Sequence, residues 1–564
     1  MRQANDARHP RSGLGRPGGV VVALTALIVA GWLVSLNSPA RGDADGAREA
    51  VRATATGEQR ARGRPNIVFI MVDDMRDDDL VYMPRTRRLI EAQGVRFVNS
   101  FAPFPLCCPA RASVLTGQYT HNHGVYDVVP PWGFTSFDDR RTIATALQAS
   151  GYATVYVGKY LNGYGAEPEP RATGGKSLHY VPRGWTEWRA SIDGGLRPRD
   201  PRAGGTYKYF DTTLSDNGEG FDNYAGRYQS DVYGRLSERI IERRAADGVP
   251  FFYYLSFTAP HAGAPLEPDD PRGVVDGAGQ EQVVNTPARP ESVWGRFDDR
   301  ITAAPGADWD DPDFSDKPDY LRRLPPLNDA VRAAVLELTR QRAEALSVVD
   351  RQVGRVMGAL SRSGELDNTL VVFTSDNGFF LGEQRRPLGK TWPHEPSLRV
   401  PLLMRGPGIP AGETRRDPFT SIDVAPTLAR VARTSLPWSV DGTSLLGVAR
   451  HGDAGWDRAV LTESGPYDGV VRDTDLAGNP LDPGEAPDIR YTIGVRSPDY
   501  LYVDVATGEE ELYDLGEDPE EYDNLVGDPA YASQLEALRR TLRDLRACVG
   551  DTCRSPLPPE LTRP

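Results

Sequence analysis

The sequence predicts an α/β fold whose central sheet is largely parallel, and three observations support this prediction. Short apolar runs that suit strands buried on both faces recur along the chain. Amphipathic segments with helical spacing lie between some of these runs. Polar side chains follow the ends of several runs, and open α/β sheets form their sites beyond the carboxyl ends of the strands. Strands that alternate with helices favour a parallel sheet.

Length and composition limit the class of protein. The chain has 564 residues, of which 39% are hydrophobic and 26% charged, as in a soluble globular enzyme. The net charge of -14 argues against general electrostatic binding to nucleic acid. Four cysteines are too few for a disulfide scaffold, and seven histidines leave little material for a zinc site of several histidines. Only five of the 65 basic residues are lysines, so each lysine has a raised chance of a specific role.

The N-terminal 64 residues precede the predicted fold. Residues 1–40 contain a basic start, an uncharged run over Val20–Leu36, and the small residues Ser38 and Ala40 at a cleavage site. This pattern predicts a secretory signal peptide, and an uncleaved signal anchor is the alternative because the run approaches the length of a membrane span. Residues 41–64 lack periodicity and suit a linker. We expect the mature protein to lie outside the cytoplasm, attached to a membrane only if this segment is retained.

Residues 65–450 are predicted to form the main domain. A helix is expected over residues 329–361, with Asn328 as its N-cap and an apolar face at helical spacing. Residues 262–325 are rich in Pro, Gly and Asp and have little periodicity, which is typical of a functional or mobile segment. The predicted strands are Asn66–Val72, Ala153–Val157, Phe251–Phe257, Thr369–Thr374 and Val400–Met404.

A smaller unit is predicted at residues 451–547, with a small antiparallel sheet and a helix. Residues 513–524 are rich in turn residues, and residues 528–546 have the pattern of a final amphipathic helix. Residues 548–564 form a tail, in which Cys548 and Cys553 are expected to pair because close cysteines in an exported protein favour a disulfide. The three predicted strands are Leu461–Glu463, Tyr491–Val495 and Tyr500–Val505.

Hard oxygen donors follow two of the buried strands in the main domain. Asp73 and Asp74 come directly after the first strand, and Asp376 and Asn377 follow the fourth. An all-oxygen set of this kind suits Ca²⁺, with Mg²⁺ as the second choice, rather than zinc or copper. Lys159 and His261 follow two further strands, so the sequence predicts that all these groups meet at one edge of the sheet.

A short motif gives the strongest indication of chemistry. Cys107, Pro109 and Arg111 have the spacing C-x-P-x-R, and Thr116-Gly117 follows. This motif resembles the recognition signature of sulfatases, in the alkaline-phosphatase superfamily. The resemblance covers most of the chain from Asn66 to about Asn524. It is closest to the N-acetylglucosamine-6-sulfatase-like branch and includes the segments NIVFIMVDD, LCCPARASVLTGQYTHNHG, VGKYLNGYG, APHA, TSDNG, SLRVPLLMRGPG and ELYDLGEDPEEYDNL.

The resemblance implies an alkaline-phosphatase-like fold and a set of site residues. Cys107, not Cys108, would be oxidised to Cα-formylglycine by a formylglycine-generating enzyme, and its hydrate would supply the nucleophile and a further metal ligand. Pro109 suits an early helical position, which places residue 107 at a helix N-terminus that favours anions. The family pattern further implies that Arg111 holds the hydrate, that Lys159 and Lys390 bind sulfate, and that His261 binds sulfate and protonates the departing alcohol.

The sequence departs from the common family pattern at one position. Many sulfatases have Lys-x-His after the second strand, but here Leu161 follows Lys159-Tyr160, and leucine transfers no proton. Asn162 is one candidate to bind the substrate in its place. His121 or His123, from a neighbouring loop, is the other candidate, so the base for sulfate release stays open.

The sequence therefore predicts an exported, metal-dependent sulfatase that acts on a sulfated sugar such as 6-sulfated N-acetylglucosamine. A broad arylsulfatase and a phosphonate or phosphate ester hydrolase are the enzymatic alternatives. A cell-surface binding protein that has lost activity is the non-enzymatic one. Such a protein is expected to lack part of the reactive set, whereas this chain retains Cys107, Arg111, Asp376 and Lys390.

Overall fold

The computed structural model describes residues 63–309, 313–467 and 469–562. The predicted signal segment and most of the linker lie outside these residues. Within the part of the chain that is described, no helix is long and apolar enough to cross a membrane.

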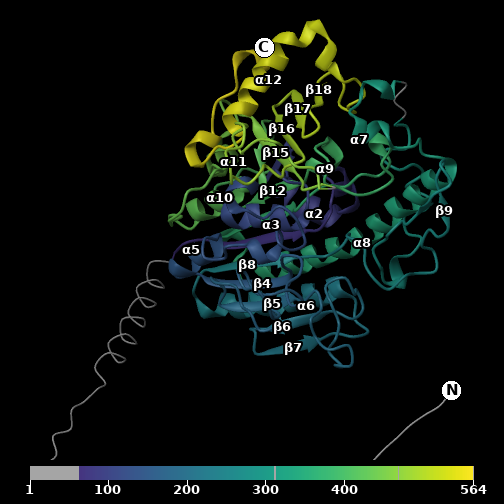
Figure 1. Ribbon diagram of the computed structural model, residues 1–564. Helices are drawn as coiled ribbons and strands as arrows, with labels where there is room; N and C mark the ends of the chain where they lie inside the picture. Colours follow the sequence, from purple (N-terminus) through teal and green to yellow (C-terminus); the bar gives the residue numbers. More distant parts are fainter. Residues whose placement is uncertain (1–62, 310–312, 468, 563–564) are drawn as a thin grey trace, which may run out of the picture. The chain divides into compact units, whose positions relative to one another are not determined.

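A ten-stranded sheet forms the centre of the fold, with the order β13-β2-β12-β11-β1-β8-β4-β5-β6-β7. Its middle is parallel, because β1 pairs in parallel with β11 and β8, and β4 with β8 and β5. Figure 1 shows β8, β4, β5, β6 and β7 following one another toward one edge. This arrangement confirms the predicted fold class. The strands are β1 (Asn66–Val72), β2 (Val95–Phe97), β4 (Ala153–Lys159), β5 (Glu187–Ser191), β6 (Thr213–Asp216), β7 (Gly220–Asn223), β8 (Phe251–Ser256), β11 (Thr369–Ser375), β12 (Leu402–Arg405) and β13 (Glu413–Arg415).

The fifth predicted strand runs against its neighbours. The run Val400–Met404 contributes most of β12, which pairs antiparallel with both β11 and β2. The chain between β11 and β12 contains only short helical turns, such as α9 (Glu395–Leu398), and no long crossover helix. A connection of this kind returns the chain antiparallel, whereas a parallel neighbour needs a long crossover.

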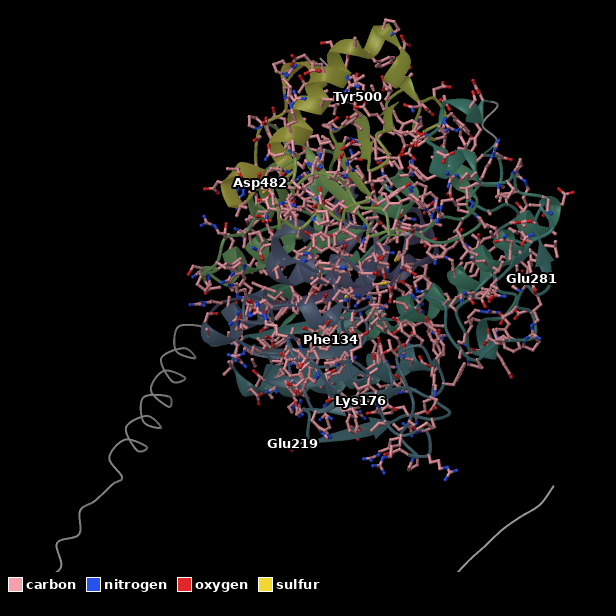
Figure 2. All side chains as sticks on the ribbon, viewed as in Figure 1. Phe134, Lys176, Glu219, Glu281, Asp482 and Tyr500 are labelled. Carbon is pink, nitrogen blue, oxygen red and sulfur yellow. A yellow bond between two sulfur atoms is a disulfide. The ribbon has the colours of Figure 1, made fainter. Side chains whose placement is uncertain are left out.

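Helices cover both faces of the sheet, and alternate residues of β1 separate the two cores. Ile67, Phe69 and Met71 belong to one core, whereas Val68 and Ile70 belong to the other. The first core includes residues of α3 (Cys107–Thr116), α5 (Ile143–Ala149), α10 (Val424–Val431) and α11 (Leu446–His451). The second includes residues of α6 (Gln229–Asp247) and α8 (Asp329–Arg362). Side chains fill the space between these layers (Figure 2).

The long helix α8 begins where the sequence predicts it. The side chain of Asn328 accepts a hydrogen bond from the backbone N–H of Val331, as an N-cap does. Parts of the irregular segment 262–325 pack against this helix, where Val274 and Val284 share a small core with Val331. The other short elements are α2 (Pro84–Leu89), α4 (Thr120–His123), α7 (Asp319–Arg322), β3 (Ser100–Phe101), β14 (Phe419–Thr420), β9 (Val274–Val275) and β10 (Glu281–Gln282).

A second, antiparallel sheet has the order β15-β16-β17-β18 and packs with the last helix. Its strands are β15 (Val460–Ser464), β16 (Thr492–Arg496), β17 (Tyr500–Val505) and β18 (Glu510–Asp514), and the helix is α12 (Ala532–Leu545). Figure 1 draws them together in green and yellow. The fourth strand, β18, has no counterpart among the three predicted strands and ends in the stretch expected to contain turns. Cys548 and Cys553 form a disulfide just after α12.

Candidate active site

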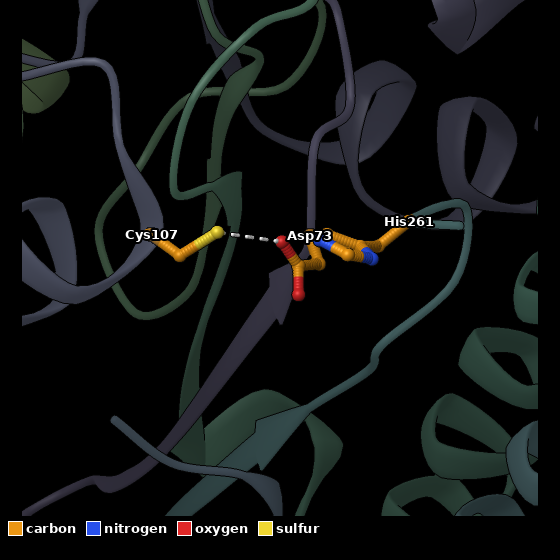
Figure 3. A group of neighbouring side chains, drawn as sticks. All are labelled: Asp73, Cys107 and His261. Carbon is orange, nitrogen blue, oxygen red and sulfur yellow. Dashed lines mark hydrogen bonds between the residues drawn. The ribbon is translucent and has the colours of Figure 1, made fainter. Parts of the chain in front are cut away.

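The polar residues that follow separate strands converge at one end of the parallel strands. Asp73 and Asp74 follow β1, Lys159 is the last residue of β4, and His261 lies shortly after β8. Figure 3 shows Asp73 between Cys107 and His261, with a hydrogen bond that joins Cys107 to Asp73. One ligand atom from each of these three residues lies within 4.8 Å of the other two.

Cys107 is the first residue of α3 and is buried against this group. Its Sγ lies 3.3 Å from Asp73 Oδ1 and 2.8 Å from Lys390 Nζ. Burial raises the pKa of the Cys107 thiol to about 12, and the Asp73 carboxylate adds to this shift. The side chain is therefore a protonated thiol rather than a reactive thiolate at neutral pH. Cys108, also buried, shares the first hydrophobic core.

Three carboxylates form the negative centre of the site. One oxygen from each of Asp73, Asp74 and Asp376 lies within 4.8 Å of the others. Asn377 donates its amide N–H to Asp74 Oδ1 at 2.7 Å, but its own Oδ1 is buried and has no hydrogen-bond partner among the described residues. Carboxylates and a free amide oxygen are the donors that Ca²⁺ and Mg²⁺ prefer, so this cluster could hold a metal ion.

Cations balance these carboxylates. Lys159 Nζ pairs with Asp73, and Lys390 Nζ pairs with Asp74. Burial alone would raise the pKa of Asp73, but Lys159, His261 and Arg111 together hold it well below its ordinary value. Asp73 is therefore ionised over the physiological pH range.

Arg111 lies fully inside the protein and ties the strand ends together. Its guanidinium is 2.8 Å from Asp376 Oδ2 and donates to Ser256 Oγ at 2.7 Å and to the carbonyl of Lys159 at 3.0 Å. These partners lie at the ends of β11, β8 and β4. The contacts of Arg111 thus join Asp376 to the ends of the strands that carry the site.

His261 presents one ring nitrogen to the site. Its Nδ1 lies 2.7 Å from the carbonyl oxygen of Ala262, which can only accept a hydrogen bond, so Nδ1 carries a proton. Its Nε2 lies 3.8 Å from Asp74 Oδ2. Burial lowers the pKa of His261, and Lys159 and Lys390 add to this effect against the opposing Asp73 and Asp74.

The two histidines of α4 have partners away from the carboxylate cluster. His123 Nδ1 accepts from the N–H of Val125 at 3.1 Å, and its Nε2 lies 3.0 Å from Ser113 Oγ. Burial lowers the pKa of His123 to about 3, so the ring is neutral. His121 Nδ1 lies 2.8 Å from Glu463 Oε1. Both histidines are therefore engaged in joining α4 to its neighbours.

Tyr207 is a site residue that the sequence reasoning missed. Its ring lies 5.0 Å from Lys159 Nζ and 4.9 Å from the ring of His261, and its hydroxyl accepts a hydrogen bond from Asn162 at 2.8 Å. Asn162 thus reaches the site through Tyr207. No motif marks Tyr207, because it lies in a loop before β6 and comes close only in the folded chain.

Two backbone features place these residues. Gly158 has φ +108°, and a Cβ there would lie 1.9 Å from the carbonyl oxygen of Ser256, so only glycine lets β4 approach β8 beside Lys159. Asp74 has φ 62°, a left-handed conformation that aspartate tolerates better than most residues. Such conformations are typical of functional sites.

Comparison with known proteins identifies the family of this chain. The sulfatase family model matches residues 65–434. N-acetylglucosamine-6-sulfatase of Homo sapiens is 30% identical over 527 residues, which cover 87% of this chain and 86% of that protein. An arylsulfatase of Volvox carteri is 30% identical over 534 residues, which cover 88% of this chain and 76% of that protein.

The extracellular sulfatases among the relatives are longer. A Drosophila melanogaster homologue is 33% identical over 396 residues, which cover 68% of this chain but only 31% of that protein. The corresponding share of a Caenorhabditis elegans homologue is 48%. This chain therefore spans about a third to a half of these proteins.

Solved structures share the fold. A complex with the substrate D-glucosamine-2-N,6-O-disulfate has a TM-score of 0.63 and 23% identity, and the match covers 86% of this chain and 97% of that chain. A phosphonate monoester hydrolase of Agrobacterium radiobacter has a TM-score of 0.58 and 23% identity, over 86% and 96% of the two chains. With the family model and the relatives that align along most of its length, this chain belongs to the sulfatase family.

Proposed function

We propose that this protein hydrolyses sulfate monoesters with a nucleophile formed from Cys107. The observation that carries the proposal is the position of Cys107, at the first turn of α3 and within reach of Asp73 and Lys390. A helix N-terminus and two lysines favour a sulfate anion, and three carboxylates favour a cation beside it. When Cys107 is converted to formylglycine, the hydrated aldehyde supplies the attacking hydroxyl.

The carboxylate cluster would hold a divalent cation, for which we propose Ca²⁺ ahead of Mg²⁺. Asp73, Asp74, Asp376 and Asn377, whose Oδ1 has no hydrogen-bond partner among the described residues, would be its ligands. Such an ion polarises a sulfate oxygen and lowers the pKa of a nearby hydroxyl. Lys159 and Lys390, as compact point charges, bind and orient the sulfate oxygens.

His261 carries the proton transfers in this proposal. Its Nδ1–H is held by Ala262, so Nε2 faces the site, and it donates a proton to the departing alcohol when the ring enters the reaction doubly protonated. Neutral Nε2 is afterwards an acceptor that can take up the proton lost on sulfate release. Leu161 cannot do so, and both ring nitrogens of His123 already have partners. Tyr207 packs against His261 and holds the ring in place.

For the substrate, we propose a sulfated sugar such as 6-sulfated N-acetylglucosamine. The similarity to N-acetylglucosamine-6-sulfatases along most of the chain supports this choice. An aryl sulfate is the second candidate, because arylsulfatases align over a similar length. The extracellular relatives support export, which agrees with the predicted N-terminal signal.

A substrate panel tests the proposal. Protein produced together with a formylglycine-generating enzyme is assayed on 6-sulfated N-acetylglucosamine, an aryl sulfate and a phosphonate monoester. We expect kcat/KM to be highest for the sugar sulfate. Preference for the phosphonate would contradict the assignment of a sulfate ester as substrate. Preference for the aryl sulfate would contradict the assignment of a sulfated sugar.

Removal of the metal tests the proposed cation site. Chelation is expected to abolish turnover, and Ca²⁺ is expected to restore it. Without a cation, the clustered carboxylates would repel a sulfate anion. Asp73→Ala should lower the bound metal measured by elemental analysis, whereas Asp200→Ala, at a surface ion pair with Arg202, should leave it unchanged. Full activity in a preparation shown to be free of metal would contradict this assignment.

A further inference from the structure

Arg386 lies in the loop that carries Lys390 and is a cation without an anionic partner among the residues that the structure describes. Its side chain is partly buried, and its Nε is buried without a hydrogen-bond partner. Its guanidinium lies over the rings of Trp392 at 4.8 Å and Phe380 at 5.4 Å. Among the residues that the structure describes, it forms no ion pair and donates no side-chain hydrogen bond. Buried charges in proteins are normally paired, so this arrangement calls for a partner.

The electrostatics of Arg386 agree with its contacts. Burial lowers its pKa to about 10, and the hydroxyls of Tyr467 and Tyr320 offset only part of this shift. Arg399, further along the chain, differs because it pairs with Glu395. The charge of Arg386 is thus desolvated by the fold without compensation from a carboxylate in the described residues.

The position of Arg386 connects it to the reacting group. Its Nη2 lies 3.8 Å from the place that a Cβ would occupy on Gly389, the residue before Lys390. Lys390 Nζ in turn lies 2.8 Å from Cys107 Sγ. After Lys390, the N–H of Thr391 donates to the carbonyl of Pro105 at 3.0 Å, which joins the loop to the segment before α3.

The backbone of this loop is left-handed at three residues other than glycine. Gln384, Arg385 and Thr391 have φ values of 53°, 56° and 85°. Left-handed backbone is a true outlier for a β-branched residue such as Thr391, and such strain persists where the surroundings fix it, often at ligand sites. The loop therefore places Arg386 and Lys390 on a shared, fixed frame.

We propose that Arg386 is a specificity-determining residue that binds a second anionic group, a sulfate or a carboxylate, on the sugar whose sulfate ester lies at Cys107. This inference rests on the proposed function and narrows its substrate class to sugars with at least two negative groups. A planar guanidinium suits either anion because its N–H groups match two oxygens at once. Lys159, Lys390 and His261 are left for the sulfate that reacts.

The test compares substrates that differ in their second anion. They are 6-sulfated N-acetylglucosamine, glucosamine-2-N,6-O-disulfate, a disaccharide with a uronate beside a 6-sulfated glucosamine, and p-nitrophenyl sulfate. Arg386→Leu keeps the apolar contacts but removes the charge. Arg386→Lys keeps the charge but loses the two-oxygen geometry. Arg385→Leu is the matched control, because the Arg385 guanidinium lies over the ring of Phe314 at 3.8 Å.

We expect Arg386→Leu to lower kcat/KM for a substrate with two anions by about 10–100-fold, as for loss of hydrogen bonds to a charged group. The loss should be much smaller for the substrates with one anion. On substrates with two anions, kcat/KM of Arg386→Lys should lie between that of the wild type and that of Arg386→Leu. The disulfate and the uronate disaccharide separate the two sources of the second anion. Wild-type preference for the substrate with two anions should weaken with salt.

Several outcomes would overturn the inference. One is an equal loss on all four substrates, as expected of a purely structural residue, and another is a wild-type enzyme that does not prefer two anions. If Arg386→Leu fails to fold, Arg386→Lys decides instead, by the ratio of kcat/KM for substrates with two anions to kcat/KM for substrates with one. Hydrolysis of p-nitrophenyl sulfate but of no sugar would agree with sulfate-ester hydrolysis and would contradict the proposal that Arg386 binds a second anion of a sugar. Hydrolysis of none of the four would contradict the proposed function itself.

Discussion

The site combines side chains whose charges would be costly if they were buried separately. Asp73 and Asp74 lie at the end of β1 with Lys159 and Lys390 as their partners. Removing one member of such a buried group leaves an uncompensated charge, which typically costs more than the pair itself contributes. Single substitutions of these charged groups therefore affect folding as well as chemistry. Their tests need a readout besides activity, such as the bound metal, whereas activity alone can test mechanism at weakly charged or neutral groups.

Cys107 is one such group, and its modification gives a direct test. The proline two positions after it fits the modification motif, whereas Cys108 has alanine at that distance. Peptide mass spectrometry of the matured protein should show the aldehyde at residue 107. Cys107→Ala should be inactive, and Cys108→Ala should keep the aldehyde. An aldehyde at residue 108, or an active Cys107→Ala variant, would contradict the assignment.

His261 gives a second test, based on the leaving group. General acid catalysis matters more as the departing oxygen becomes more basic, and a sugar alkoxide is far more basic than a nitrophenolate. His261→Ala should therefore lower kcat on a sugar sulfate by about 10²–10⁴-fold more than on p-nitrophenyl sulfate. A burst experiment on each substrate checks that sulfate release is not limiting. Where sulfate release is not limiting, equal losses on the two substrates would mean that His261 gives the departing alcohol no proton.

At the scale of elements, the sequence predicted what local pattern determines. The apolar runs before Asp73 and Asp376 and the amphipathic pattern of α8 gave their strands and helix within a few residues. The antiparallel direction of β12 depends on the path of the connecting loop, and β18 depends on pairing with β17. The local hydrophobic pattern therefore predicts neither feature. Tyr207 was missed for the same reason, since only tertiary packing brings it to Lys159.

The approach of β4 to β8 gives a prediction at this scale. In Gly158→Ala the new Cβ would meet the Ser256 carbonyl, and the left-handed φ would add strain. Together these effects should lower the free energy of unfolding by about 2–5 kcal/mol and displace Lys159. Gly248→Ala is the matched control, because Gly248 also has a positive φ but nothing lies within 4 Å of its Cβ position. Denaturant unfolding measures the free energy of unfolding of both variants. Equal losses would show that backbone strain at the positive φ, and not the clash with Ser256, lowers stability.

At the scale of the whole molecule, buried ion pairs join the C-terminal sheet to the elements around the site. Glu463 in β15 binds His121 of α4 at 2.8 Å and Arg490 at 2.7 Å. His121 Nε2 also lies 2.8 Å from the carbonyl oxygen of Cys548, at the start of the disulfide-bonded tail. On the other side, His394, four residues after Lys390, lies 3.0 Å from Glu511 of β18. The C-terminal sheet therefore supports the loops that carry site residues.

The His121–Glu463 pair makes part of the stability depend on pH. Burial alone would lower the pKa of His121, but the Glu463 carboxylate raises it above its ordinary value of 6.5. The folded protein thus binds this proton more tightly than the unfolded chain does. Its contribution to stability is present in full below pH 6.5 and is lost as the pH rises through the raised pKa of the folded state.

His121→Gln should remove this dependence while it retains a hydrogen bond to Glu463. We expect the wild type to lose stability relative to the variant as the pH rises from below 6.5 to above the raised pKa, because only the wild type releases the proton. Urea unfolding at a series of pH values measures this difference. His179→Gln is the matched control, since His179 is exposed and its Nδ1 lies 2.7 Å from the backbone carbonyl oxygen of Gly218 rather than from a carboxylate. If the wild type and His121→Gln change in parallel across this range, His121 is not protonated in the fold and the ion pair does not couple the sheet to α4.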